Sequence, residues 1–370
     1  MNFSLTDDQR MIQDSARTFL AEEASADRRR KVLESPDGWD ADLWKRLGGE
    51  MGWTGIMIPE EFGGAGLGAV ELGLILEEMG RVLAVAPFFE TAALAAPVIL
   101  FAGSNEQKEA LLGPIATGEV SATLAMRSSA RDFGLAHIGP SFEGGVLSGE
   151  AHFVPFGHVV DQLVVAARTG AGVSLVAVPA NAPGVAAVKN ISLDETRPYA
   201  TITFNNVQVA ADMVLGAPGQ AGPALERALA MAAALLAAEQ TGGADYSLEA
   251  VVEYSQQRVQ FDRPIGSFQA VKHQFADMML KVEAARSAAY YACAAQNSDE
   301  AMEAASVARI YCSDAFSRCA SDAVQLHGGI GFTWEHHAHL YFKRARSSAS
   351  LLGSPAQHRE SVAQLIGLDS

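Results

Sequence analysis

The chain has 370 residues, of which 49% are hydrophobic, and a formal charge of −16 at pH 7. This length exceeds what one compact core needs and predicts two or three domains. The negative charge argues against nucleic acid or an anionic membrane surface as a partner, because both require basic patches. It leaves room for a phosphate-bearing ligand that is held by a few local arginines.

The cysteines and the apolar segments indicate where the protein works. Cys293, Cys312 and Cys319 lie in one helical region without a CxxC pair or zinc-type histidine spacing, which predicts reduced thiols. The N-terminal residues lack the basic and apolar segments of a signal peptide. The apolar run 228–238 is too short to span a bilayer. We therefore expect a cytoplasmic protein without membrane insertion.

Residues 1–118 are predicted to form an N-terminal helical domain. Thr6 and Gln9 fit a capping box, and apolar residues follow at helical spacing. A glycine-rich loop at 59–66 separates the early helices from the later ones. The later helical segments are expected at Leu72–Leu83, Ala92–Phe101 and Asn105–Leu112.

The pattern changes in the middle of the chain and then returns to helical. Residues 119–222 predict a small β domain, with strands at Leu163–Arg168, Val173–Val178 and Thr201–Val209. Residues 223–370 predict a C-terminal helical bundle, with helices at Pro223–Arg258, Phe268–Asn297 and Asp299–Leu326. The expected fold is therefore α+β and mostly α, in three domains.

The segment after the first long C-terminal helix has the features of a pyrophosphate site. Arg258 ends that helix, a Pro-Gly turn follows, and Ser267 is placed to cap the next helix. A forked cation beside the free N–H groups of a helix start suits a pyrophosphate. The alternative is that Arg258 only complements the dipole of its own helix. Local physics leaves both interpretations open.

Two strings in this half of the chain resemble the signatures of the acyl-CoA dehydrogenase family. Arg258–Gln269 is close to the family pattern Arg-x-x-Phe-x-x-Pro-Ile-x-x-Phe-Gln, and Gln325–Thr333 matches the second signature. Both strings are long, and they occur in the family's order and separation. The order helices, β domain, helices agrees from Asn2 to Leu368, so the resemblance covers essentially the whole chain.

The resemblance implies a flavoprotein that binds FAD and assembles as a tetramer. The positions that match flavin adenine dinucleotide contacts, chiefly to its phosphates and adenosine, are Arg258, Phe261 and Gln269. The positions that approach the same cofactor from a neighbouring subunit are Gln325, Gly328 and Gly329. Glycine suits this role because backbone approaches a phosphate closely only where no Cβ intervenes.

The family's reaction is the α,β-dehydrogenation of an acyl-CoA thioester, and it needs a carboxylate base. In relatives this base is the glutamate of a Tyr-Glu-Gly-Thr-like turn that follows an Arg/Lys-Ala-Arg/Lys run. Arg344-Ala-Arg346 sets the register here, and the turn reads Leu351-Leu-Gly-Ser354. Leu352 takes the position of the glutamate and cannot accept a proton.

A displaced base is the alternative that the sequence leaves open. Some relatives place the base early in the long C-terminal helix, at a position that aligns with Ala232. Glu239 is the nearest conspicuous carboxylate and lies roughly 10 Å farther along the axis. Its apolar surroundings suit a raised pKa, although a structural hydrogen-bonding role is commoner. Glu226, nearly two turns the other way, is a weaker candidate.

The β domain also departs from the family pattern. Relatives present Thr-Glu-Pro-Gly-Ala-Gly-Ser-Asp after a strand, where backbone and hydroxyl groups contact the flavin ring. Here Leu124–Asp132 takes this place without the Pro and Gly residues, although Ser128 and Ser129 offer hydroxyls. An ordinary surface loop is an equal alternative. A later Trp-containing strand motif is replaced by His152–Gly157.

Histidines near the C-terminus raise the possibility of a metal site. His336, His337 and His339 lack helical i, i+4 spacing and a surrounding carboxylate frame, so we expect no metal. The resemblance places them at a helix start near the cofactor. Trp334 and Tyr341 are predicted to be packing residues.

Three functional hypotheses follow. The first is a base-lacking subunit of a heteromeric acyl-CoA dehydrogenase, similar to bacterial subunits that act on steroid-derived CoA esters. The second is a self-sufficient dehydrogenase with a displaced base, and the third is a non-catalytic acyl-CoA or protein-binding scaffold. The resemblance further implies an electron-transferring flavoprotein as acceptor and a homo- or heterotetramer with a second acyl-CoA dehydrogenase subunit.

Overall fold

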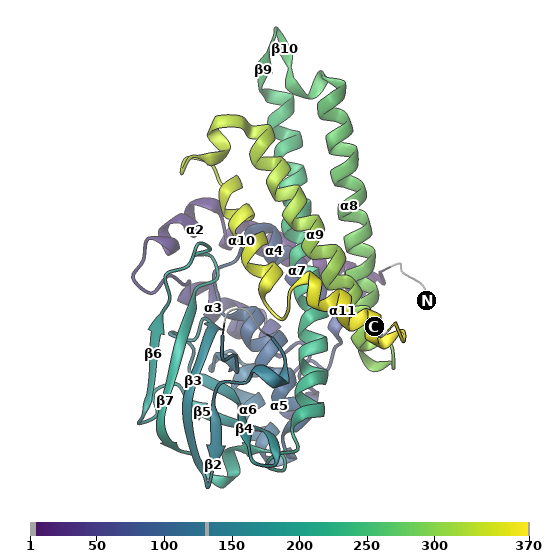
Figure 1. Ribbon diagram of the computed structural model, residues 1–370. Coiled ribbons are helices and arrows are strands. Elements are labelled where there is room, and N and C mark those ends of the chain that lie inside the picture. The colour runs from purple at the N-terminus through teal and green to yellow at the C-terminus, as the bar shows by residue number, and fades with distance from the viewer. Residues whose placement is uncertain (1–4, 130–132, 369–370) are drawn as a thin grey trace. The chain divides into compact units, whose positions relative to one another are not determined.

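The structure is a computed structural model that describes residues 5–129 and 133–368 (Figure 1). The chain folds into two compact units, each built from segments that are distant in sequence. The helical unit contains the chain up to Lys31, Ala69–Ala84 and the chain from Ala233 onward. The sheet unit contains Val32–Gly68 and Val85–Ala232.

The helical unit is built from long helices of both chain ends. It contains α1 (Asp7–Glu23), most of α2 (Ala26–Leu33), α4 (Ala69–Val82), the greater part of α7 (Gly222–Gln257), α8 (Gln269–Ala294), α9 (Ala301–His327), α10 (Ala338–Ser350) and α11 (Pro355–Leu365). Beyond the ends of α7 and α8, the short strands β9 (Val259–Gln260) and β10 (Arg263–Pro264) form a hairpin at the tip of this unit (Figure 1).

Two glycines let α4 and α7 cross at backbone contact. A Cβ at Gly80 would lie 1.9 Å from the Glu239 carbonyl oxygen, and a Cβ at Gly242 would lie 1.8 Å from the Glu77 carbonyl oxygen. No side chain fits at either position, because such distances are far below van der Waals contact. The crossing therefore fixes an N-terminal helix against the long C-terminal one.

Buried acidic groups on α4 join this crossing to α8. Glu77 is 1% exposed and accepts hydrogen bonds from Arg286 at 3.0 Å and from the Tyr290 hydroxyl at 2.7 Å. Glu78 is 2% exposed and is paired with Arg17 at 2.9 Å. Burial raises the pKa of the Glu77 carboxyl although Arg286 opposes the shift. These contacts explain how two carboxylates are tolerated in an apolar interior.

The sheet unit packs short helices with one eight-stranded sheet. Its helices are α3 (Ala41–Lys45), α5 (Ala96–Ala102), α6 (Asn105–Ala116) and the π-helical segments Arg46–Glu50 and Phe89–Ala95. Its strands are β1 (Ala122–Ala125), β2 (Ser141–Glu143), β3 (Val146–Pro155), β4 (Gln162–Thr169), β5 (Gly172–Pro179), β6 (Val185–Lys189), β7 (Tyr199–Gln208) and β8 (Val214–Leu215). The strand order is β6-β7-β3-β2-β4-β5-β8, and β1 pairs in parallel with β4.

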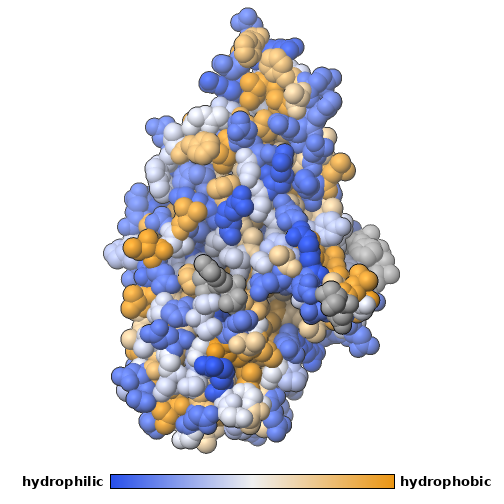
Figure 2. Space-filling model, in the orientation of Figure 1, coloured by the Kyte–Doolittle hydropathy of each residue, from blue (hydrophilic) through white to orange (hydrophobic). Residues whose placement is uncertain are grey.

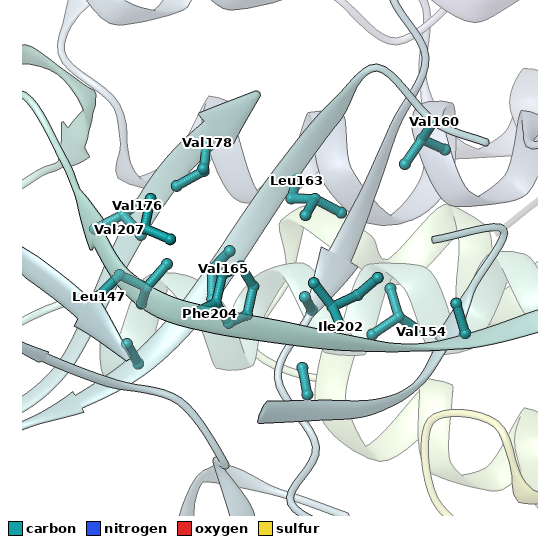
Figure 3. Close-up of a cluster of buried hydrophobic side chains, with 14 of the residues drawn as sticks. Leu147, Val154, Val160, Leu163, Val165, Val176, Val178, Ile202, Phe204 and Val207 are labelled. Carbon is teal, nitrogen blue, oxygen red and sulfur yellow. The ribbon is translucent and has the colours of Figure 1, made fainter. Parts of the chain in front are cut away.

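The core of the sheet unit lies on its central strands. Leu147, Val165, Val176, Ile202 and Phe204 come from β3, β4, β5 and β7 and meet in one apolar cluster (Figure 3). Five consecutive residues of β4, 163–167, are buried, as expected for a strand covered on both faces. Strand β6 is almost wholly exposed because it forms the edge of the sheet.

Most of the sequence expectations agree with this fold. The α+β, mostly α fold class is confirmed, as are the capping box at Thr6 and the three expected strands. The cap at Ser267 is wrong, because the N-cap of α8 is Phe268 and no side chain caps that helix. The three domain boundaries stay a prediction. Within the described residues, no helix is long and apolar enough to cross a membrane.

Candidate cofactor and catalytic site

The turn that is expected to hold the catalytic base adopts a strained conformation. Leu352 has a φ of 59° and Gly353 a φ of 94°, both in the left-handed region. For leucine this conformation costs roughly 1–2 kcal/mol, so the surroundings must impose it. Leu352 is 4% exposed and lies in an apolar interior, and a capping box at Ser354 starts α11 directly afterwards.

A buried arginine imposes this conformation. Arg309 on α9 is 0% exposed and donates hydrogen bonds to the carbonyl oxygens of Leu351, at 2.8 Å, and Ser348, at 2.9 Å. It also donates to the Gln240 side chain on α7. Sequence reasoning missed this residue. The available signal was a lone cation in the apolar stripe of an amphipathic helix, where a buried partner has to exist.

A histidine holds the turn from the other side. The Nε2–H of His358 donates to the Leu352 carbonyl at 3.0 Å, and the Ser306 hydroxyl donates to Nδ1 at 3.3 Å. Burial, and next the charge of Arg309, lower the pKa of His358 to about 4. The ring is therefore neutral at neutral pH. The turn retains a firmly fixed backbone around a side chain that has no acid–base chemistry.

Glu239 is held by an ion pair in the helical unit. Its carboxylate accepts a hydrogen bond from Arg344 of α10 at 2.9 Å, and both residues are buried, at 4% and 2% exposure. A carboxylate that is paired with a buried guanidinium is stabilised in its charged form and is a poor proton acceptor. This contact favours the structural role over the role of a base. Glu226, the other candidate, is exposed.

The arginine of the first signature is exposed at the tip of the helical unit. Arg258 follows α7 directly, and the Ile265 N–H donates to its carbonyl, which closes the hairpin. In the described parts of the chain, its guanidinium has no hydrogen-bond or ion-pair partner. Phe261 is 86% exposed with a φ of 54°, and Gln269 is exposed as the first residue of α8. Hydrophobic residues are visible on the surface of this tip (Figure 2).

The glycines of the second signature leave open space at the end of α9. Gly328 has a φ of 67°, and a Cβ at Gly328 or Gly329 would meet no atom within 4 Å. Gln325 in the last turn of α9 is exposed. The positive φ requires glycine at 328. The empty volume at both positions leaves the backbone accessible to a ligand.

The structure brings these two signature segments to one end of the helical unit. The rings of Tyr254 on α7 and His327 on α9 lie 4.6 Å apart between their centres. His327 and His336 continue the stack at 4.1 Å. A cavity of about 230 Å³ lies beside them, lined also by Tyr246, Gln257 and Ala338. Arg258 and Gly328 each follow directly on residues that line this cavity.

The histidines of this region are neutral at physiological pH. Burial, followed by nearby positive charges, lowers the pKa values of His336, His337 and His339 to about 4. No group of three or more potential ligands that could hold a metal ion occurs within the described ranges. Tyr341 is 2% exposed and is a packing residue as expected. Trp334 is 63% exposed and packs at the surface, edge-on against His339 at 4.7 Å between ring centres and beneath Lys343.

The loop after β1 is folded back on β3 in the sheet unit. The Arg127 guanidinium carbon lies 5.9 Å from the ring centre of Phe133 and 6.0 Å from that of Phe153. Arg127 is 9% exposed. Ser128 is exposed and its N–H donates to the His137 carbonyl at 2.8 Å. The last expected residues of this loop, 130–132, lie outside the described residues.

The two halves of a dinucleotide cofactor meet different surroundings in this chain. Within the described chain, the exposed guanidinium of Arg258 has no partner and the backbone at Gly328 and Gly329 is open, and this chemistry suits the phosphates of a dinucleotide. In the segments expected beside the flavin ring, 124–132 and 152–157, the described residues place the Arg127 guanidinium carbon 6.0 Å from the Phe153 ring centre.

The comparisons with known proteins identify the family. The family model "Acyl-CoA dehydrogenase, N-terminal domain" matches residues 6–119, and "Acyl-CoA dehydrogenase, C-terminal domain" matches residues 222–367. Over 359 residues the chain is 33% identical to acyl-CoA dehydrogenase IpdE2 of Mycolicibacterium smegmatis, with 95% of this chain and 97% of the relative covered. The chain belongs to the acyl-CoA dehydrogenase family.

Solved structures of the same fold include assemblies of two differently named chains. A chain of the ChsE4–ChsE5 complex from Mycobacterium tuberculosis superposes with a TM-score of 0.90 at 26% identity, and each chain is covered completely. A chain of the Tcur3481–Tcur3483 steroid ACAD superposes with a TM-score of 0.87 at 31% identity, with 98% of each chain covered.

Proposed function

We propose that this chain is the base-lacking subunit of a heteromeric, FAD-dependent acyl-CoA dehydrogenase. The observation that carries the proposal is the turn at Leu352. Arg309 and His358 fix its backbone, yet the side chain at the position of the base is an aliphatic one. A carboxylate is required to remove the α-proton of the thioester. Another chain of the assembly would supply it.

The retained role of this chain is to bind the cofactor. Arg258 would pair with the phosphates, and the backbone at Gly328 and Gly329 would approach them closely. Phe261, in the hairpin after α7, and Gln269, at the start of α8, would complete the adenosine side, and Gln325, in the last turn of α9, would act with the glycines. When bound, FAD supplies the acceptor for the hydride that leaves the β-carbon. The exposed guanidinium of Arg258, which has no partner within the described residues, supports this role.

The substrate class and the assembly are inferred from relatives. The steroid ACAD and the ChsE4–ChsE5 complex support an acyl-CoA substrate with a bulky steroid-derived group and a heterotetramer with a second family subunit. An electron-transferring flavoprotein would accept the electrons. The negative charge of the chain agrees with the absence of nucleic acid from this scheme.

The two alternatives make different demands on the structure. A self-sufficient enzyme would need Glu239 as base, and this carboxylate would have to leave its buried partner Arg344. A scaffold without catalysis would have no need for an exposed arginine beside open glycine backbone. The contacts of Glu239 and the state of Arg258 therefore support the heteromeric subunit over both alternatives.

The test compares the purified chain alone with the chain purified together with a family member that has a glutamate in the equivalent turn. Flavin content and the loss of flavin absorbance on adding a steroid-derived acyl-CoA are measured. We expect substrate-dependent loss of absorbance only in the complex, because only the complex has a base. Glu239→Gln in this chain should leave the reaction of the complex intact.

Three results would contradict parts of the proposal. Loss of absorbance in the lone chain, abolished by Glu239→Gln but unchanged in the exposed control Glu226→Gln, would establish a displaced base. A complex that contains no flavin would favour the scaffold. A complex that reacts equally well after loss of the partner's glutamate would exclude the partner as the source of the base.

A further inference from the structure

A cavity in the helical unit contains a buried acceptor that the proposed cofactor contacts do not use. The cavity has a volume of about 230 Å³ and is lined by the last turns of α7, the end of α9 and the start of α10 (Figure 1). His327 lines it and is 4% exposed. The Nε2 atom of His327 is buried and has no hydrogen-bond partner within the described residues. A buried polar atom of this kind needs a partner from outside the chain.

The hydrogen bonds of the histidine rings show which nitrogen can accept. The Nδ1–H of His327 donates to the Ala323 carbonyl oxygen at 2.7 Å, so Nε2 of the neutral ring carries a lone pair. Burial lowers the pKa of His327, which keeps this ring neutral at neutral pH. His336 has the opposite arrangement, because its Nδ1 accepts from the Ala338 N–H at 3.1 Å. His327 Nε2 is therefore a fixed acceptor, and a ligand has to bring the donor.

The walls of the cavity suit a flat ring. Tyr254, His327 and His336 form a stack of rings, with 4.6 Å and 4.1 Å between successive centres. Ala250 and Ala323 supply apolar wall beside this stack. A planar aromatic ligand can extend such a stack. A cavity of roughly 150 Å³ is enough to bind benzene. The volume of about 230 Å³ therefore suits a molecule with two fused rings.

The charges around the cavity argue against a phosphate-bearing ligand inside it. Among the described residues that line the cavity, the only side chain charged at neutral pH is Glu253, which is exposed. Arg29 contacts the Tyr341 ring, with 5.9 Å from its guanidinium carbon to the ring centre, but does not line the cavity. An anion would therefore meet a carboxylate and no lining cation, whereas a neutral or cationic ring would not be repelled.

We propose that this cavity is a binding site for a small neutral or cationic aromatic molecule, of the size of indole, whose N–H donates to His327 Nε2. The site is separate from the phosphate contacts proposed for Arg258, and it does not depend on the proposed function. Mostly apolar walls with one placed polar group are typical of small-molecule sites. Because a bound ring would contact α7, α9 and α10 together, its binding should also raise the melting temperature of the chain.

Calorimetric titration of the full-length chain with a series of probes tests the site. Indole has the ring and the N–H donor, 1-methylindole lacks the donor, and indole-3-carboxylate adds a negative charge. We expect 1-methylindole and indole-3-carboxylate each to bind at least about tenfold more weakly than indole. The first leaves Nε2 unsatisfied, and the second brings an anion beside Glu253. An excess of ADP should not displace indole, because no phosphate site lies inside the cavity.

Variants of the chain locate the bound probe. His327→Phe keeps a flat ring and removes the acceptor, so indole should bind it no better than 1-methylindole binds the natural chain. Ala250→Phe fills part of the cavity without removing a hydrogen-bonding group, and it should abolish binding of both probes. The matched control is His273→Phe, which replaces an exposed histidine of α8 and should bind indole as the natural chain does. If His327→Phe does not fold, the probe series and Ala250→Phe still decide the result.

Several outcomes would overturn the proposal. Equal affinities for indole and 1-methylindole would show that Nε2 accepts nothing from the ligand. Indole binding that survives Ala250→Phe would lie elsewhere, and no binding to the natural chain would mean that the cavity holds water only. Displacement of indole by ADP would assign the cavity to the cofactor. Failure of ADP to bind at all would contradict the phosphate contacts proposed for Arg258, and the indole series would still decide the cavity by itself.

Discussion

The tip of the helical unit and the turn at 351–354 differ in whether their polar groups have internal hydrogen-bond partners. At the tip, the guanidinium of Arg258 has no partner within the described chain, and glycine backbone faces open space. At the turn, buried side chains satisfy the backbone carbonyls, and the central side chain is apolar. The tip therefore leaves polar groups accessible to a ligand, whereas the backbone of the turn is already held by internal hydrogen bonds.

The largest expected effect concerns the buried pair that anchors α10. Arg344→Met leaves the Glu239 carboxylate without its buried partner, which should lower the free energy of unfolding by about 3–5 kcal/mol. Urea denaturation measures the change. The double variant Arg344→Met/Glu239→Leu should recover much of the loss. If the single variant is as stable as the natural chain, Glu239 is free enough to serve in catalysis.

The next effect concerns the residue that holds the turn. Arg309→Met removes the donor to the carbonyl oxygens of Leu351 and Ser348 in the interior, and we expect a loss of about 3 kcal/mol. The matched control is Arg318→Met, which removes an arginine with 60% side-chain exposure from the same helix and should cost less than about 1 kcal/mol. Equal losses of stability in the two variants would show that Arg309 does not hold the turn.

A substitution at the tip should change the affinity for the ligand but not the stability of the fold. Arg258→Ala removes a charge-assisted contact with the phosphates and should weaken ADP binding by about 2 kcal/mol, or roughly 30-fold. The melting temperature should stay the same, because this side chain has no partner in the described chain. Calorimetric titration and a thermal scan measure both. A lowered melting temperature with unchanged affinity for ADP would show that Arg258 stabilises the fold and does not bind the ligand.

The smallest effect is a dependence of stability on pH at the turn. The folded-state pKa of His358 is about 4, below the ordinary value of 6.5, so the unfolded chain binds this proton more readily. The free energy of unfolding should therefore fall as the pH drops from 6.5 to 4. His358 should account for about 1 kcal/mol of this fall once solvent screening is allowed for. Urea denaturation across this range should show a shallower slope for His358→Gln, and an unchanged slope would contradict the assignment.

The sequence predicted the helices and strands, which depend on local patterns. It did not predict the contacts that join residues distant in sequence. Helical spacing and turn residues located the long helices, the central strands and the turn between α7 and α8 correctly. Arg309 escaped prediction because its backbone acceptors lie 39 to 44 residues further along the chain. The left-handed backbone of Phe153, with a φ of 53°, also escaped prediction, because phenylalanine rarely adopts that conformation. The roles of the cofactor contacts stay a prediction until binding is measured.

The crossing of α4 and α7 has a consequence for how the protein is made. Glu77 on α4 finds its partners Arg286 and Tyr290 209 and 213 residues later in the chain. At a synthesis rate of about 5–20 residues per second, α4 must wait roughly 10–40 seconds on the ribosome before those partners exist. During this time its apolar face and two carboxylates have no native contacts with the later helices. The native contacts between α4 and α8 can therefore form only late in synthesis, when most of the chain has been made.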